Sequence, residues 1–169
     1  MKYKVLVSIT ISTYNVADYV KSSICSILSQ SYKNFELICI DDGSTDGTYE
    51  ILKRYEKNDP RVRVLRNERN QGLAYNRNLS LELANGKYIM FVDGDEDSEI
   101  SSIKIKDSNF DARRHDEKEY LLERPAFIWT KLIRTSVARN LKIYFPLGLT
   151  RQDVPVHWQL ITMLDDIEV

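Results

Sequence analysis

An acidic pair near the middle of the chain carries the strongest chemical signal in this sequence. Asp93 and Asp95 flank Gly94, whose missing side chain leaves both carboxylates open to approach. Such a pair can hold a hard divalent cation, and Mg²⁺ or Mn²⁺ bridging a diphosphate is the natural occupant. An acidic turn that stays solvated is the alternative for so short a motif. An EF-hand calcium loop is disfavoured, because Lys104 or Lys53 would stand where its bidentate glutamate belongs.

A second polar cluster, residues 41–47, follows an apolar run and includes Asp42. At the end of a strand, the carboxylate of Asp42 can accept a hydrogen bond from a nucleobase or a ribose. Tyr14 follows an earlier apolar run and is a flat aromatic residue suited to stacking on a base. The alternatives are ordinary turn chemistry for the cluster, with Asp46 capping the next helix, and a half-buried core position for Tyr14.

The elements that position these acidic residues and Tyr14 are predicted from short apolar runs that alternate with helical patterns. The strand-like runs are residues 5–11, 35–40, 62–65 and 87–92, and the helical patterns are residues 16–28, 48–55 and 73–83. This βαβαβαβ order predicts an α/β fold with a largely parallel sheet covered by helices. Ligands of such sheets bind beyond the carboxyl ends of the strands, so residues 12–15, 41–47 and 93–97 should converge on one crevice.

Residue types also predict details of two helices. Asn15 stands where the N-cap of the first helix is expected. Tyr75, Leu79 and Leu83 recur at four-residue spacing and mark the apolar face of the third helix. This face is therefore expected to pack against the sheet.

The regular pattern ends after residue 97. Residues 98–124 are highly charged and indicate a solvated loop or mobile lid. They are followed by an apolar run at 125–133 that contains Trp129, a short helical piece to Asn140, a turn at 145–148 and a helix from about 153 to 164. Residues 167–169 resemble the start of a strand, which suggests an incomplete domain. We expect a single domain with a core at 1–97, the charged loop at 98–124 and a last segment at 125–169.

Composition disfavours several classes of protein. With 24 basic and 25 acidic residues the net charge is −1, so the chain lacks the basic field of a nucleic-acid-binding domain. No uncharged stretch is long enough to cross a bilayer. Cys25 and Cys39 lie in apolar surroundings without a metal-ligand spacing, which predicts two buried, reduced thiols in a cytoplasmic protein.

Several motifs, taken in order, resemble the family 2 nucleotide-sugar glycosyltransferases. They are residues 7–15, 26–32, 40–46, 70–73 with 77–78, and 86–95. The resemblance covers about the first 97 residues and resumes weakly at 129–132 and at 145–153. It implies a GT-A fold, which is Rossmann-like, followed by a short acceptor-side part. It also implies a nucleotide diphosphate sugar as donor, with a UDP-sugar favoured, and inversion at the anomeric carbon.

The resemblance assigns donor contacts to the residues that match the family's motifs. Thr13 and Tyr14 would border the nucleobase, and Asp42 would accept a hydrogen bond from its ring N–H. Gly94 would lie against the donor in the acidic turn. Arg77 would assist the diphosphate through charge-assisted hydrogen bonds, although a surface ion pair on the third helix explains an arginine there equally well.

The resemblance also implies the metal ligands and the acceptor side. Asp95 would be the chief ligand of Mn²⁺ or Mg²⁺, assisted by Asp93. Asp153 falls where the family keeps its catalytic base, which takes the proton of the acceptor hydroxyl. Gln152 replaces the glutamate that usually precedes this base. Trp129 is a candidate sugar-stacking aromatic on the acceptor side, with a buried core position as the alternative.

These assignments predict transfer of a sugar to a saccharide or lipid-linked saccharide acceptor in bacterial surface polysaccharide biosynthesis. The expected location is the cytoplasm, including peripheral association with the inner face of the membrane. A non-catalytic nucleotide-sugar-binding module is the alternative raised by Gln152 and by the short 98–124 region. A sugar nucleotidyltransferase is less consistent, since it would bring a Gly-rich, basic loop after the first strand, and residues 12–15 are neither.

Overall fold

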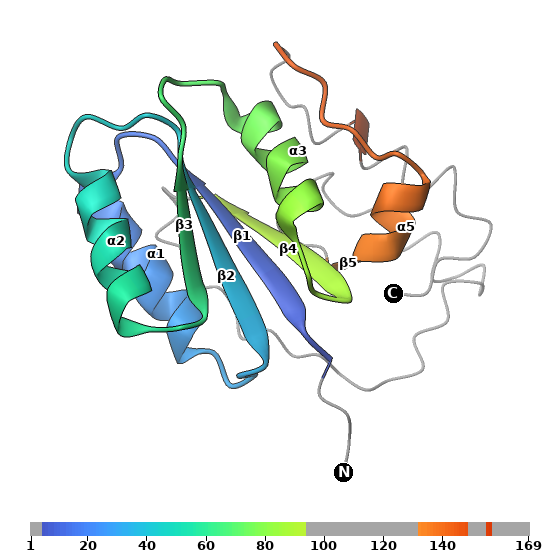
Figure 1. Ribbon diagram of the computed structural model, residues 1–169, viewed down its shortest axis with the longest axis horizontal. Helices are drawn as coiled ribbons and strands as arrows, with labels where there is room; N and C mark the ends of the chain where they lie inside the picture. Colours follow the sequence, from blue (N-terminus) through green and yellow to red (C-terminus); the bar gives the residue numbers. More distant parts are fainter. Residues whose placement is uncertain (1–4, 94–131, 149–154, 157–169) are drawn as a thin grey trace, which may run out of the picture.

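The computed structural model describes residues 5–93, 132–148 and 155–156, which are coloured along the chain in Figure 1. The strands are β1 (Val7–Thr13), β2 (Phe35–Asp41), β3 (Val62–Arg66), β4 (Tyr88–Asp93) and β5 (Leu132–Arg134). The helices are α1 (Ala17–Ser29), α2 (Thr48–Asn58), α3 (Leu73–Leu83) and α5 (Thr135–Asn140). The predictions for residues 98–124, Trp129, Gln152, Asp153 and 157–169 lie outside the described residues.

The strands form one sheet in the order β3-β2-β1-β4-β5. β1, β2, β3 and β4 are parallel, and β5 pairs antiparallel with β4. The chain builds outward from β1 through β2 to β3 and then returns to place β4 on the other side of β1. The predicted α/β fold with a mostly parallel sheet is confirmed. Because the strand order reverses between β1 and β4, this boundary is where a ligand of such a sheet is expected to bind.

Helices cover both faces of the sheet, and each face has its own apolar core (Figure 1). Ile11, Ile24 and Leu52 are fully buried between the sheet and the pair α1 and α2. On the other face, beside α3 and α5, Phe91 and Phe145 pack edge to face with ring centroids 5.3 Å apart. Dense packing on both faces supports the carboxyl ends of β1, β2 and β4.

Helix α3 has the predicted bounds but a different buried face. Tyr75, which was predicted to mark the apolar face, is 40% exposed. The buried side chains are those of Ala74, Asn76, Arg77, Ser80 and Leu81. The face is polar because it meets the loop after β3, where Asn67 donates a hydrogen bond to the amide oxygen of Asn76 (2.8 Å). Tertiary hydrogen bonds override the hydrophobic pattern here.

The two cysteines lie in different environments, and both are free. Cys39 is buried in β2, and burial raises the pKa of its thiol. Cys25 is exposed on α1, so the prediction of a buried thiol was wrong for this residue. It follows the buried Ile24 and therefore falls on the outer side of the helix. Burial and a hydrogen bond with the Cys25 sulfur, 3.2 Å away, raise the pKa of Tyr55 to about 12.

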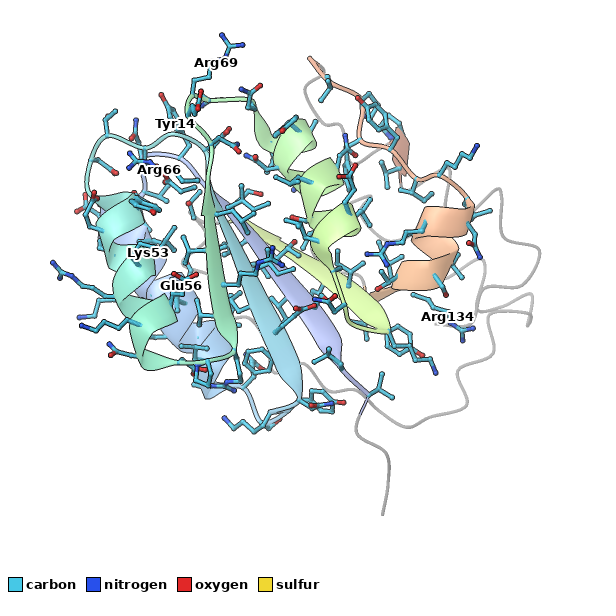
Figure 2. The ribbon with its side chains drawn as sticks, viewed as in Figure 1. Tyr14, Lys53, Glu56, Arg66, Arg69 and Arg134 are labelled. Atoms are coloured by element: carbon cyan, nitrogen blue, oxygen red, sulfur yellow. The ribbon has the colours of Figure 1, made fainter. Side chains whose placement is uncertain are left out.

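β3 is an edge strand of the sheet, and two of its N–H groups already have hydrogen-bond partners. Val62 donates to the carbonyl of Asp59 (3.0 Å), and Val64 donates to Oε1 of Glu56 (2.6 Å). Glu56 also pairs with Lys53 on the same helix, and both are labelled in Figure 2. These partners limit the pairing of β3 with a strand of another chain. Among the described residues, no helix has the length and apolar content needed to span a bilayer.

The predicted short helical piece ending at Asn140 is confirmed as α5, and α3 holds this part of the chain in place. The amide of Asn78 donates to the carbonyl of Phe145 (3.0 Å) and accepts from its N–H (2.8 Å). The guanidinium of Arg139 donates to the carbonyls of Leu81 (2.7 Å) and Ala84 (2.6 Å). Arg139 thus satisfies carbonyls at the end of α3 that lack an intrahelical partner.

Replacing Arg139 with alanine is expected to lower the free energy of unfolding by about 1.5–3 kcal/mol, because hydrogen bonds from a charged donor contribute roughly that much. Urea denaturation measures the loss. Lys21→Ala removes an equal charge from the exposed surface of α1 and should change stability by less than about 0.5 kcal/mol. Equal losses in the two variants would contradict the capping role of Arg139.

Candidate functional site

The polar clusters after β1, β2 and β4 meet at one edge of the sheet, as the fold class predicts. Thr13 is the register partner of Asp41, and Ser12 is the register partner of Asp93. The N–H of Asp42 donates to the carbonyl of Thr13 (2.8 Å), which joins the first two loops as they leave the sheet. We call the carboxyl ends of β1, β2 and β4, with residues 12–15 and 41–47, the rim.

Asp42 is only 3% exposed, and the loop after β3 engages its carboxylate. Oδ1 accepts hydrogen bonds from the side chain of Asn67 (2.6 Å) and from the N–H of Gln71 (2.9 Å). Oδ2 accepts from the N–H of Gly72 (2.9 Å), the N-cap residue of α3. A carboxylate has about four acceptor positions, so the position left for a ligand is on Oδ2. Asp42 therefore holds the loop after β3 against the rim, independently of any ligand.

Tyr14 and Thr13 are neighbours in sequence but differ in exposure. Tyr14 is 47% exposed, and Figure 2 shows it at the same end of the sheet as Arg66 and Arg69. Thr13 is buried, and its hydroxyl donates to the carbonyl of Ile40 (3.3 Å). Thr13 thus joins β1 to β2 beneath the rim, while the ring of Tyr14 is available for stacking.

Asn15 does not cap α1, contrary to the prediction. The N-cap residue is Val16, and Asn15 precedes it with a φ of 52°, in the left-handed region. Asparagine tolerates this conformation better than most residues. The Oδ1 atom of Asn15 accepts a hydrogen bond from the N–H of Thr45 (2.9 Å). Asn15 therefore turns the chain from β1 into α1 and ties it to the next loop.

Two side chains of the loop between β2 and α2, together with Thr48 at the start of α2, bind the N–H groups at the entry to α1. Three consecutive N–H groups donate to them, Asn15 to Ser44 Oγ (3.0 Å), Val16 to Thr48 Oγ1 (3.0 Å) and Ala17 to Asp46 Oδ2 (2.9 Å). A helix N-terminus with free N–H groups is a common binding site for phosphate. In this chain those three groups already bind protein atoms.

Asp46 caps both neighbouring helices, whereas the sequence predicted a cap for α2 alone. Its Oδ1 accepts hydrogen bonds from the N–H (3.0 Å) and the hydroxyl (2.6 Å) of Thr48, in the first turn of α2. Its Oδ2 accepts from the N–H of Ala17 in α1. Desolvation raises the pKa of Asp46, but the hydrogen bonds from Thr48 and Ala17 outweigh it and hold the pKa below its ordinary value. The charged carboxylate is also favourable beside two helix N-termini.

Asp41 lies fully buried beneath the same loop. Its Oδ2 accepts from the N–H of Ser44 (3.2 Å) and pairs with Nε of Arg66 (3.3 Å). Burial raises the pKa of this carboxyl, and the hydrogen bonds from Ser44 and the charge of Arg66 offset only part of the rise. Arg66 also donates to the carbonyl of Ser44 (2.9 Å) and lies over the ring of Tyr49. Arg66 thus holds the loop from the β3 side.

Residues 8–104, more than half of the chain, match the sequence model of the family described as Glycosyl transferase family 2. The chain belongs to this family. The matched residues of this family 2 domain include all three polar clusters, 12–15, 41–47 and 93–97.

Curated relatives carry glycosyltransferase names. TuaG of Bacillus subtilis (strain 168), named for teichuronic acid biosynthesis, is 46% identical over 94 residues, which are 56% of this chain and 37% of TuaG. WfaP of Escherichia coli, named UDP-Glc:alpha-D-GlcNAc-diphosphoundecaprenol beta-1,3-glucosyltransferase, is 43% identical over 91 residues, which are 54% of this chain and 36% of WfaP. The family 2 domain described here spans little more than a third of the length of either relative.

Solved structures share the fold of this family 2 domain. TarS of S. aureus, residues 1–349 in complex with UDP-GlcNAc, has a TM-score of 0.72 at 23% identity and covers 90% of this chain and 52% of its own. The mannosyltransferase PcManGT of Pyrobaculum calidifontis, in complex with GDP-Man and Mn²⁺, has a TM-score of 0.66 at 17% identity and covers 92% of this chain and 51% of its own. These likenesses confirm the GT-A fold.

Arg77 of this family 2 domain is buried, with 2% of its surface exposed. Its guanidinium carbon lies 5.5 Å from the ring centroid of Phe145, between α3 and the segment after α5. The alternative that placed Arg77 at the surface of α3 is therefore wrong. A contact between Arg77 and the donor diphosphate stays a prediction.

The sequence did not reveal the residues that hold the rim in shape. Asn67 links Asp42 to Asn76, and Ser44 and Thr48 accept hydrogen bonds at the entry to α1 from the neighbouring loop and from the start of α2. In the sequence these three residues have the types of ordinary turn or loop residues, because their hydrogen-bond partners lie far away along the chain. The available signal was the adjacency of two polar loops at the ends of neighbouring parallel strands.

Proposed function

We propose that this chain forms the donor-binding and catalytic part of an inverting, divalent-metal-dependent glycosyltransferase. The enzyme would transfer a sugar from a nucleotide diphosphate sugar, a UDP-sugar being favoured, to a saccharide or lipid-linked saccharide in bacterial surface polysaccharide biosynthesis. One observation carries the proposal. Thr13, Asp42 and Asp93 meet at the switch point of the sheet, with the exposed ring of Tyr14 beside them in sequence. Family membership supports the reaction class.

We expect the diphosphate to depend on a cation, and the N–H groups of residues 15–17, at the entry to α1, already have protein partners. Asp93 ends β4 beside Ser12, and Asp95 lies outside the described residues. Carboxylates are ligands that Mg²⁺ and Mn²⁺ prefer, so this pair fits the metal. The part of the chain that the structure describes contains no group of three or more His, Cys, Asp or Glu residues placed to hold one. A Mn²⁺ or Mg²⁺ ion at Asp93 and Asp95 would neutralise the diphosphate as it leaves.

Asp153 is the proposed catalytic base. Its carboxylate would take the proton of the acceptor hydroxyl as that oxygen attacks the anomeric carbon. The bond between this carbon and the diphosphate oxygen breaks in the same displacement, and a single displacement inverts the configuration. The segment before Asp153 is attached to α3 through the paired hydrogen bonds of Asn78 and Phe145.

The named relatives support the substrate classes. TarS was solved with UDP-GlcNAc and PcManGT with GDP-Man and Mn²⁺, and the name of WfaP specifies a UDP-Glc donor and a diphosphoundecaprenol-linked acceptor. We propose the same classes of donor, metal and acceptor for this chain. An acceptor linked to a lipid would place the enzyme at the inner face of the membrane, associated peripherally.

Two other functions make different predictions. A sugar nucleotidyltransferase is disfavoured, because residues 12–15 are not the Gly-rich, basic loop that such an enzyme would have after its first strand. A non-catalytic donor-binding module is favoured by one observation, the presence of Gln152 where the family has glutamate. Such a module would bind donor without transferring or hydrolysing the sugar.

Thermal-shift measurements with UDP-sugars, with and without Mn²⁺, test the proposal. We expect a UDP-sugar to stabilise the chain only when Mn²⁺ is present, by about 2.7 kcal/mol at a hundredfold excess over Kd. Asp95→Ala should abolish this effect, and Asp18→Ala, an exposed position on α1, should preserve it. Normal Mn²⁺-dependent affinity in Asp95→Ala would remove the metal assignment.

A further inference from the structure

We propose that Asp46 is a positioning residue for the nucleobase loop, which we define as residues 13–17. Its carboxylate fixes the turn that carries Tyr14 by joining the first turn of α1 to the first turn of α2. The inference rests on the proposed function, because it takes Tyr14 as a neighbour of the bound nucleobase. Asp46 itself touches no reacting atom, and it acts through the loop.

The nucleobase loop depends on outside partners for its shape. None of the cap hydrogen bonds described for α1 comes from a side chain of α1 or of its N-cap residue Val16. Asn15 sits in the left-handed region, a conformation that costs free energy in any residue other than glycine. The hydrogen bonds that residues 15–17 donate to Ser44, Thr48 and Asp46 offset this cost. Without them, the turn would relax and the ring of Tyr14 would lose its fixed position.

The three side chains that accept from the N–H groups of residues 15–17 do not contribute alike. Ser44 and Thr48 are buried and each accepts one hydrogen bond from the nucleobase loop. Asp46 accepts from Ala17 and also from both donors of Thr48, so it orients the hydroxyl that caps Val16. Of the three hydrogen bonds donated by the N–H groups of residues 15–17, loss of the Asp46 carboxylate therefore weakens two at once. Hydrogen bonds to a charged acceptor are also the stronger kind.

The chemistry of the bridge requires a carboxylate. An asparagine at position 46 has one acceptor oxygen and an NH₂ group, so it can accept from Thr48 or from Ala17 but not from both sides. Asp46→Asn should keep the cap of α2 and release α1. Because Asp46 is exposed, this substitution opens no cavity in either core.

The test compares the binding of two ligands, each with Mn²⁺. UDP carries a nucleobase, and inorganic pyrophosphate does not. Pyrophosphate has no base, so its affinity depends on the metal and not on the nucleobase loop. In Asp46→Asn we expect the Kd of UDP to rise about tenfold, the effect of losing a hydrogen bond to a charged group. The Kd of pyrophosphate should stay within about twofold of its original value. Isothermal titration calorimetry measures both.

Asp18→Asn is the matched control, since it removes the same charge from the first turn of α1, where Asp18 is exposed. It should leave both affinities unchanged. Thr48→Val and Thr48→Ser form a second pair, in which valine removes the hydroxyl that caps Val16 and serine retains it. We expect weaker UDP binding in the valine variant and recovery in the serine variant.

Unchanged UDP affinity in both Asp46→Asn and Thr48→Val would overturn the positioning role. An equal loss for UDP and pyrophosphate would overturn it as well, because it would indicate general damage to the fold. An unsubstituted chain that binds pyrophosphate with Mn²⁺ but not UDP would instead refute the proposed function, and with it the premise of this inference.

Discussion

Asp153→Asn is expected to slow sugar transfer at least about a hundredfold and to leave donor affinity nearly unchanged. Asparagine has almost the same shape as aspartate but cannot take a proton from the acceptor hydroxyl. The donor is expected to bind at the rim, where Tyr14, Asp42 and Asp93 are placed by other elements. Initial rates of transfer from a UDP-sugar give the first quantity, and calorimetry with the same donor and Mn²⁺ gives the second.

The split between rate and affinity is what identifies a base. Asp18→Asn, at an exposed position on α1, should change neither quantity. Unchanged transfer by Asp153→Asn would place the base elsewhere in the chain. An unsubstituted chain that binds donor but neither transfers nor hydrolyses the sugar would favour the non-catalytic module that Gln152 raises.

The fold could be predicted because its strands are buried on both faces. Such strands need nearly continuous apolar runs, and residues 5–11 and 35–40 supply them without competing helical periodicity. The bounds of α3 were correct at both ends because Gly72 precedes the helix and Asn85 with Gly86 follows it. β5 was missed as a strand, since the three residues Leu132–Arg134 are too few to show a period of two.

The errors concern which side of an element meets a polar partner. Tyr75 has the spacing of a core residue, but α3 turns Asn76 and Arg77 inward because Asn67 and Phe145 are there to meet them. Asn15 has the residue type of an N-cap, but the cap is supplied by a loop that begins at the end of another strand. Local preference cannot show such partners, because they are far away in sequence.

The same limit applies to the candidate site. The convergence of three polar clusters followed from a general rule about parallel sheets, and it is confirmed for Thr13, Asp42 and Asp93. The number of hydrogen bonds that Asp42 already accepts could not be predicted, since its donors belong to the loop after β3. The residue types at the rim can therefore be predicted from sequence. The acceptor positions that Asp42 leaves for a ligand cannot.

Gly86→Ala is expected to lower the free energy of unfolding by about 3 kcal/mol or more, at the upper end of what overpacking costs. A Cβ atom at this position would lie 2.4 Å from the backbone nitrogen of Ser8 and 2.7 Å from the carbonyl oxygen of Tyr88. Neither atom can move freely, because β1 and β4 pair there from Val7 with Tyr88 to Ser12 with Asp93. The N–H of Gly86 also donates to Oγ of Ser8 (2.8 Å), whose hydroxyl binds Glu36.

Guanidinium denaturation of the original chain and of Gly86→Ala gives the difference in the free energy of unfolding. A domain of ordinary stability has about 5–15 kcal/mol and would lose a large part of that stability. Gly148→Ala separates steric overlap from backbone strain, because Gly148 has a φ of 75° and, among the residues that the structure describes, no atom beyond its chain neighbours lies within 4 Å of the added Cβ. That control should cost only about 1–2 kcal/mol, the penalty of a left-handed residue with a side chain. A smaller loss of stability for Gly86→Ala than for Gly148→Ala would mean that β1 and β4 separate easily at their amino ends. The rim at their carboxyl ends would then lack the rigid support that donor binding requires.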